Sequence, residues 1–135
     1  MTDRSDHDEI VDLTIRYATA IDRRQYQLLS TVFTADADLD YGEVGHWTAA
    51  AEVIEFMDRA HAGAANTMHR MSNQVIVADG DAATARTYVD ALILGPEGSG
   101  VNAIGFYDDE LIRTADGWRI SKRTFTSVRL VMVGA

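Results

Sequence analysis

The chain has 135 residues, with 21 acidic and 12 basic side chains, a formal net charge of −9 and no cysteine. This length suits one ordinary domain, so residues 1–135 are expected to form a single unit. The acidic excess repels phosphate backbones and anionic lipids, which argues against nucleic acid or a membrane as a partner. Without cysteine, disulfides, thiolate zinc sites and cysteine nucleophiles are excluded. The polar N-terminus has no signal-peptide pattern, so we expect a soluble cytoplasmic protein.

The first half of the chain has the pattern of helices. An apolar residue recurs with helical period from Ile10 to Ile21, which predicts an amphipathic helix that begins with a capping box near Ser5 and ends near 22–23. The pattern further predicts, in chain order, a short helix over 26–33, a short strand over 37–41 and a helix over 48–61.

The second half has the pattern of long strands joined by tight turns. Strands are predicted over 67–79, 81–94, 101–114 and 118–133, with Asp-Gly hairpin turns at 79–80 and 116–117. Helices followed by strands predict an α+β fold, with the helices packed on one face of a curved antiparallel sheet. The apolar end of the last strand, 128–133, is expected to face a partner or to close a pocket.

Three segments of the chain resemble the SnoaL-like branch of the nuclear transport factor 2-like superfamily. They are IRYATAIDRRQYQLLSTVFTADADLDYG, MHRMSNQVIVADGDAATARTYVDA and GFYDDELIRTADGWRISKRTF, within a resemblance that covers about residues 8–128. The resemblance implies a cone-shaped α+β barrel that encloses a pocket for a small hydrophobic ligand, and a homodimer or higher homo-oligomer. Members of this superfamily include dehydratases, isomerases, polyketide cyclases and epoxide hydrolases, so the reaction depends on the residues of the pocket.

His69 and Asp22 are the main catalytic candidates. Strand alternation puts His69 on one face with Met71, Asn73, Val75 and Val77, where an imidazole among apolar walls can transfer protons near neutral pH. A core or solvent-facing histidine is the alternative. Asp22 is expected at the C-terminus of the first helix, where the helix dipole disfavours an anion; an exposed Asp paired with a neighbouring Arg is the alternative.

The resemblance adds roles for these two residues and for Tyr17. Tyr17-x4-Asp22 resembles the Tyr and Asp pair on the first helix of bile acid 7α-dehydratase, and His69 corresponds to the strand histidine of the dehydratases. Five helical residues separate directions by about 140°, so a regular helix would not aim Tyr17 and Asp22 at one point. The pairing therefore requires a pocket that wraps the helix end or a distorted last turn.

Four further polar residues are candidates for binding a substrate. They are Tyr41, Asn73, Asp90 and Tyr107, although pairing with an Arg on the next strand is the default explanation for Asp90. The remaining histidines, His7, His46 and His61, fall in a terminal cap, a turn and a helix end, and no metal-binding pattern is present. No nucleotide-binding motif occurs either, so no metal and no cofactor are expected.

These residues favour acid–base chemistry without a cofactor. The leading hypothesis is a dehydratase or isomerase acting on an apolar cyclic substrate such as a steroid or polyketide. His69 would move the proton and Asp22 would support the imidazole, while Tyr17, with Tyr41 as a second candidate, would donate hydrogen bonds to the oxyanion. Cyclisation and epoxide hydrolysis stay open. The alternative is a non-catalytic module that binds a hydrophobic molecule or serves as a partner subunit.

Overall fold

The computed structural model describes residues 5–134, in which helices precede a run of long strands. The elements are α1 (Asp6–Asp22), the 3-10 helix η1 (Tyr26–Thr31), β1 (Phe33–Asp40), the 3-10 helix η2 (Gly42–Val44), β2 (His46–Trp47), α2 (Ala50–Ala60), β3 (Asn66–Asp79), β4 (Ala82–Leu94), β5 (Gly100–Thr114) and β6 (Gly117–Val133). The expected α+β class is confirmed.

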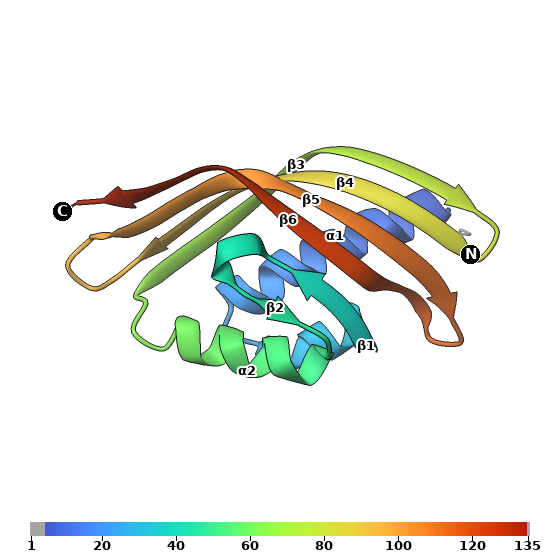
Figure 1. Cartoon of the computed structure of the whole chain (residues 1–135), viewed down its shortest axis with the longest axis horizontal. Helices are drawn as coiled ribbons and strands as arrows, with labels where there is room; N and C mark the ends of the chain where they lie inside the picture. Colours follow the sequence, from blue (N-terminus) through green and yellow to red (C-terminus); the bar gives the residue numbers. More distant parts are fainter. Residues whose placement is uncertain (1–4, 135) are drawn as a thin grey trace.

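A six-stranded sheet in the order β2-β1-β6-β5-β4-β3 forms the larger layer. Its neighbours are antiparallel except β1 and β6, which pair in parallel. The sheet arches over α1 and α2 (Figure 1), and it does not close on itself, so the expected cone is open between its edge strands β2 and β3. The short β2 and the parallel pairing of β1 were not predicted from the sequence.

Helix α1 begins and ends where the sequence predicts. The Ser5 hydroxyl accepts a hydrogen bond from the backbone N–H of Asp8 at 3.1 Å and caps the helix. Beyond the last residue, Arg24 adopts a positive φ of 61°, which turns the chain back toward the sheet. Its guanidinium then donates to Thr67 Oγ1 at 2.6 Å and to the carbonyl of Ala64 at 3.2 Å. These bonds fasten the end of α1 to the start of β3.

Strand β3 contains a bulge that corrects the predicted face. The register with β4 shifts between Ser72 and Val75, and Asn73 in the bulge has a φ of 51°. An extra residue reverses the alternation, so Val75 and Val77 are 64% and 60% exposed instead of sharing the face of His69. The prediction of one face from 69 to 77 is therefore wrong beyond Met71, and the side chain that follows on the inner face is Gln74.

The end of β6 exposes apolar side chains. Val128, Leu130 and Met132 are 69%, 52% and 80% exposed. Their role as a partner surface or a pocket lid stays a prediction, as does the homo-oligomer, which light scattering would check. Within residues 5–134, no helix is both long enough and apolar enough to cross a membrane.

Candidate active site

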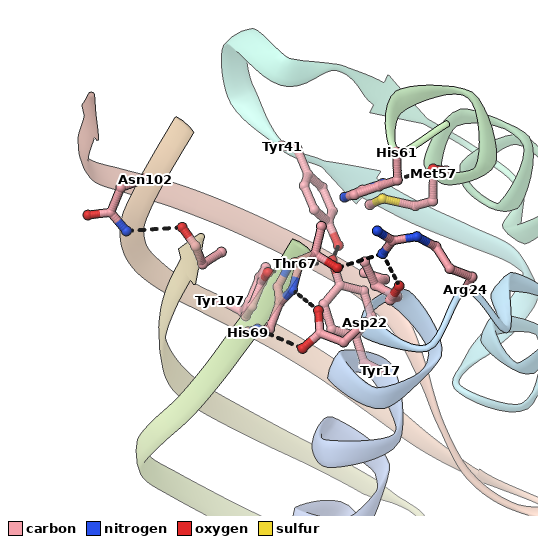
Figure 2. Close-up of polar contacts among 12 residues, drawn as sticks. Tyr17, Asp22, Arg24, Tyr41, Met57, His61, Thr67, His69, Asn102 and Tyr107 are labelled. Carbon is pink, nitrogen blue, oxygen red and sulfur yellow. Dashed lines mark hydrogen bonds and ion pairs between the residues drawn. The ribbon is translucent and has the colours of Figure 1, made fainter. Parts of the chain in front are cut away.

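Asp22 and His69 form a two-pronged contact between α1 and β3 (Figure 2). Asp22 Oδ1 lies 2.7 Å from His69 Nδ1, and Asp22 Oδ2 accepts the backbone N–H of His69 at 2.7 Å. Because a carboxylate only accepts, Nδ1 must carry the hydrogen. The second ring nitrogen, Nε2, has no hydrogen-bond partner within residues 5–134, so in the neutral ring it holds a free lone pair.

The imidazole of His69 is nearly buried while it remains next to open space. The exposed fractions of the His69 and Asp22 side chains are 7% and 22%. Both residues line a groove of about 270 Å³ at the junction of α1 and β3, together with Ile15, Thr19 and Met71 among others. The low exposure strengthens electrostatic interactions with the ring.

Tyr17 contacts the His69 ring by packing, whereas Asp22 bonds to it. The Tyr17 ring packs edge-on against the imidazole, with centroids 6.3 Å apart and an interplanar angle of 88°. Tyr17 and Asp22 both reach His69 from the regular helix α1, without a distorted last turn. No hydrogen bond joins Tyr17 to His69 or to Asp22.

Behind the imidazole, three buried tyrosines bring their hydroxyl groups together. Tyr17 and Tyr41 are hydrogen-bonded through their hydroxyls at 2.8 Å, and the Tyr107 hydroxyl donates to that of Tyr17 at 3.5 Å. Burial raises the pKa of all three phenols above the usual value, so they stay neutral donors at physiological pH. Tyr17, Tyr41 and Tyr107, predicted from separate elements, are thus in contact.

A buried ion pair contacts the three tyrosines. Arg123 binds Asp109 through two bonds of 2.8 and 2.9 Å, and both side chains are 0% exposed. The guanidinium also donates to the Tyr41 hydroxyl at 3.4 Å and lies 3.9 and 4.4 Å from the ring centroids of Tyr107 and Tyr17. Burial opposes the charge on Arg123, but the adjacent Asp109 carboxylate outweighs it and raises the pKa of the guanidinium.

One hydroxyl hydrogen of the three tyrosines has no acceptor in this cluster. Three hydroxyls carry three hydrogens, and the two hydroxyl–hydroxyl bonds use two of them. Arg123 only donates to the Tyr41 hydroxyl, since a guanidinium cannot accept a hydrogen bond. With Tyr107 donating to Tyr17, the spare hydrogen is on Tyr17 or on Tyr41. Within residues 5–134 no acceptor takes it.

Asn73 and Asp90 lie apart from this cluster. Asn73 is exposed in the β3 bulge. Asp90 binds Arg70 across to β3 and accepts from Asn102 Nδ2 at 2.8 Å, and these contacts hold its pKa below the usual value. The default explanation for Asp90 was pairing with an Arg, and this is what the structure contains. Neither side chain is brought to His69.

Sequence reasoning missed Arg123 and Asp109. The signal available was one charged residue on each of two neighbouring strands, but the adjacent residues Asp108 and Lys122 offered an equal alternative. As for metals, residues 5–134 contain no group of three or more His, Asp or Glu side chains placed to hold an ion.

Comparisons with known proteins agree with this small α+β class. Residues 2–124 match the SnoaL-like domain, and the chain belongs to that family, as its three segments predicted. An uncharacterised protein of Mycobacterium tuberculosis is 32% identical over 125 residues, which are 90% of this chain and 85% of the relative.

Solved structures share the fold over most of the chain. The Kfla4162 protein of Kribbella flavida is 29% identical with a TM-score of 0.86, over 93% of both chains. A hexachlorocyclohexane dehydrochlorinase of Novosphingobium barchaimii is 17% identical with a TM-score of 0.81, over 94% of this chain and 89% of the other. At that identity the likeness concerns the fold alone.

Proposed function

We propose that this protein is a cofactor-independent enzyme that removes a proton from carbon next to a carbonyl group in an apolar cyclic substrate. The observation that carries the proposal is the double hydrogen bond from His69 to Asp22. It holds the imidazole in one tautomer and leaves the Nε2 lone pair as the base. The pair lies on the groove of about 270 Å³ described above, where a substrate C–H can reach it.

In the first step, the C–H electrons move into the carbonyl to form an enolate while His69 Nε2 takes the proton. The ring becomes an imidazolium, whose charge the Asp22 carboxylate stabilises through the existing Nδ1–H bond. The negative charge collects on the carbonyl oxygen. The spare hydroxyl hydrogen on Tyr17 or Tyr41 is the donor we assign to that oxygen, supported by the adjacent Arg123.

In the second step, the proton held by His69 determines the type of reaction. In a dehydratase, the enolate re-forms the carbonyl, the C–O bond at the β carbon breaks, and His69 gives its proton to the departing hydroxyl as water. In an isomerase, the same proton returns to another carbon of the conjugated system.

The alternative of a non-catalytic binding module predicts that His69 and Asp22 point to different places. Their two bonds of 2.7 Å argue against it. If the Asp22–His69 contact only stabilised the fold, the bond to the backbone N–H would be enough. The second bond, to the imidazole, would then be unexplained.

Exchange of carbon-bound hydrogen tests the proposal without knowledge of the natural substrate. A panel of cyclic ketones with tetralone, decalone and steroid skeletons would be screened by thermal shift, and NMR in D2O would follow deuterium entry next to the carbonyl. We expect exchange faster than in buffer with the native protein, and background exchange with His69→Gln. Asp36→Asn, at an exposed position of β1, is the matched control. Exchange that persists in His69→Gln would rule out this mechanism.

A further inference from the structure

A second histidine lies close to the Asp22–His69 pair. His61 follows α2 directly and is 6% exposed. Its Nδ1 lies 2.8 Å from the carbonyl of Met57, to which it can only donate. Nδ1 therefore carries the ring hydrogen, and Nε2 has a lone pair and no hydrogen. Within residues 5–134, no side chain or backbone group bonds to that nitrogen.

The orientation of the ring matters as much as its tautomer. Figure 2 shows the free end of His61 directed away from α2, toward Tyr41 and the side where Thr67 lies. Asp22, His69 and Arg24 all lie close enough to affect the pKa of His61, Asp22 raising it and the other two lowering it. The Tyr26 ring packs beside it with centroids 6.2 Å apart. His61 is therefore a buried, neutral acceptor near the catalytic pair.

A wide groove leads to this histidine. It measures about 980 Å³ between η1 and α2, and its lining includes His61, Arg24, Tyr26, Ile54 and Asp58. Arg24 lines this groove, and its guanidinium bonds Thr67 Oγ1, two residues before His69 on β3. The groove shares no lining residue with the one beside Asp22 and His69, so a substrate that contacts both histidines would reach His61 past Arg24.

We propose that His61 Nε2 accepts a hydrogen bond from a hydroxyl group of the substrate on which the Asp22–His69 pair acts. A neutral imidazole with only an acceptor exposed selects a hydroxyl or N–H and rejects a carbonyl or carboxylate. The substrate class narrows from cyclic ketones to hydroxylated cyclic ketones. The inference rests on the proposed function, and it makes His61 a specificity-determining residue.

A purely structural role does not account for both ring nitrogens. The bond from Nδ1 to Met57 satisfies one carbonyl at the end of α2. Nε2 adds nothing to that cap, and its lone pair has no partner within residues 5–134 although His61 lines the groove. A hydroxyl group of a bound molecule can supply the missing donor.

Two substitutions separate the two nitrogens. In His61→Asn the amide nitrogen takes the place of Nδ1 and keeps the bond to Met57, while the Nε2 acceptor is lost. In His61→Gln the amide oxygen reaches the position of Nε2. The probes are 1-tetralone and its 5-, 6- and 7-hydroxy derivatives, with dissociation constants measured by titration calorimetry.

We expect at least one hydroxytetralone to bind the native protein about three- to ten-fold more tightly than 1-tetralone, the range of one hydrogen bond. That preference should vanish in His61→Asn, return in part in His61→Gln and persist in Asp22→Asn. If no hydroxylated probe binds more tightly, or if the preference survives in His61→Asn, the proposal is wrong.

Two further readouts cover misfolding and a failure of the proposed function. Should His61→Asn not fold, the 15N resonance of His61 Nε2 in the native protein serves instead, and must move when the preferred hydroxytetralone is added but not with 1-tetralone. If this resonance does not move with the hydroxytetralone, the proposal is wrong. Failure of the catalytic proposal looks different, since deuterium exchange would then be insensitive to His69→Gln while the hydroxyl preference still depends on His61.

Discussion

The carboxylate of Asp22 accepts both N–H groups of one residue, His69, at 2.7 Å each. The residues are 47 positions apart, so a single side chain closes a long loop between α1 and β3. It holds the edge strand β3 against α1 and sets the direction of the imidazole. A displacement of α1 would therefore misplace the base, which couples the stability of this contact to the chemistry we propose.

Asp22→Asn should weaken both the stability that this contact provides and its hold on the imidazole. The amide has one acceptor oxygen for two donors, and its NH2 group faces the remaining N–H. We expect a loss of about 1–3 kcal/mol in the free energy of unfolding, the cost of a buried donor without a partner. Urea unfolding measures it, with Asp36→Asn as the exposed control. Deuterium exchange into the ketone panel should fall in the same variant, and unchanged stability with unchanged exchange would contradict the coupling.

Local patterns predicted the elements of this fold, and bulges limited the prediction of side-chain direction. The ends of α1 and the long strands follow from capping, helical period and Asp-Gly turns. The inner face of β3 was predicted correctly as far as Met71 and was lost at the Asn73 bulge. A bulge depends on the fit of two strands in three dimensions, and alternation along one strand does not encode it.

The same limit explains why the buried Arg123 was not found. On β6, alternation from Ile120 places Arg123 on the outer face. A register shift next to Ser121 reverses this, so Arg123 pairs with Asp109 on the inner face. Asp22 and His69 were predicted as a pair through the family resemblance, because residue chemistry alone left a solvated Asp and a core His open.

Asn73 should be a structural residue of the bulge. Its φ of 51° is a conformation that glycine tolerates and β-branched residues resist. We expect Asn73→Gly to change the free energy of unfolding by less than about 1 kcal/mol, and Asn73→Val to lower it by about 1–2 kcal/mol. Thermal and urea unfolding compare the two. Deuterium exchange into the ketone panel should be the same for Asn73→Gly and the native protein. A large loss of exchange would instead indicate that Asn73 belongs to the active site.

The unused hydroxyl hydrogen predicts unequal effects of removing the three tyrosine hydroxyls. Tyr17→Phe and Tyr41→Phe each remove a group that can hold it, and we expect exchange rates to fall about 10²–10³-fold, as for loss of one oxyanion donor. Tyr107→Phe removes only a long bond of 3.5 Å and should cost much less. NMR exchange rates with one ketone decide this. Equal losses in all three variants would show that the cluster acts through packing.

The Arg123–Asp109 pair should be costly to break and cheaper to replace. Arg123→Met leaves a carboxylate that is 0% exposed without its partner, and we expect a loss of about 3–5 kcal/mol in the free energy of unfolding. The double variant Arg123→Met with Asp109→Leu should recover much of it. Arg86→Met is the matched control, because Arg86 pairs with the neighbouring Asp108 at the surface and should lose far less. A double variant no more stable than the single one would contradict this account.

His61 should make the protein less stable in mild acid. Burial lowers the pKa of His61 in the folded chain; His69 and Arg24 act in the same direction, while the Met57 carbonyl and Asp22 oppose them. The unfolded chain titrates near about pH 6.5, so below that pH it binds a proton that the folded chain refuses. The free energy of unfolding should therefore fall as the pH drops from about 6.5 toward the lower folded pKa, with no contribution above that range. Urea unfolding between about pH 7.5 and 5.5 measures this slope, which should be shallower in His61→Asn.

Protonation of His46 should have the opposite effect on the free energy of unfolding. His46 is therefore the control for the pH dependence expected of His61. Its hydrogen bond to Asp38 raises the pKa of His46, so protonation there favours the folded chain. That contribution is present below the unfolded pKa and is lost as the pH rises through the folded pKa. His46→Gln should therefore steepen the loss of stability in acid while His61→Asn reduces it. If both variants changed the slope in the same direction, the neutral, buried state assigned to His61 would be wrong.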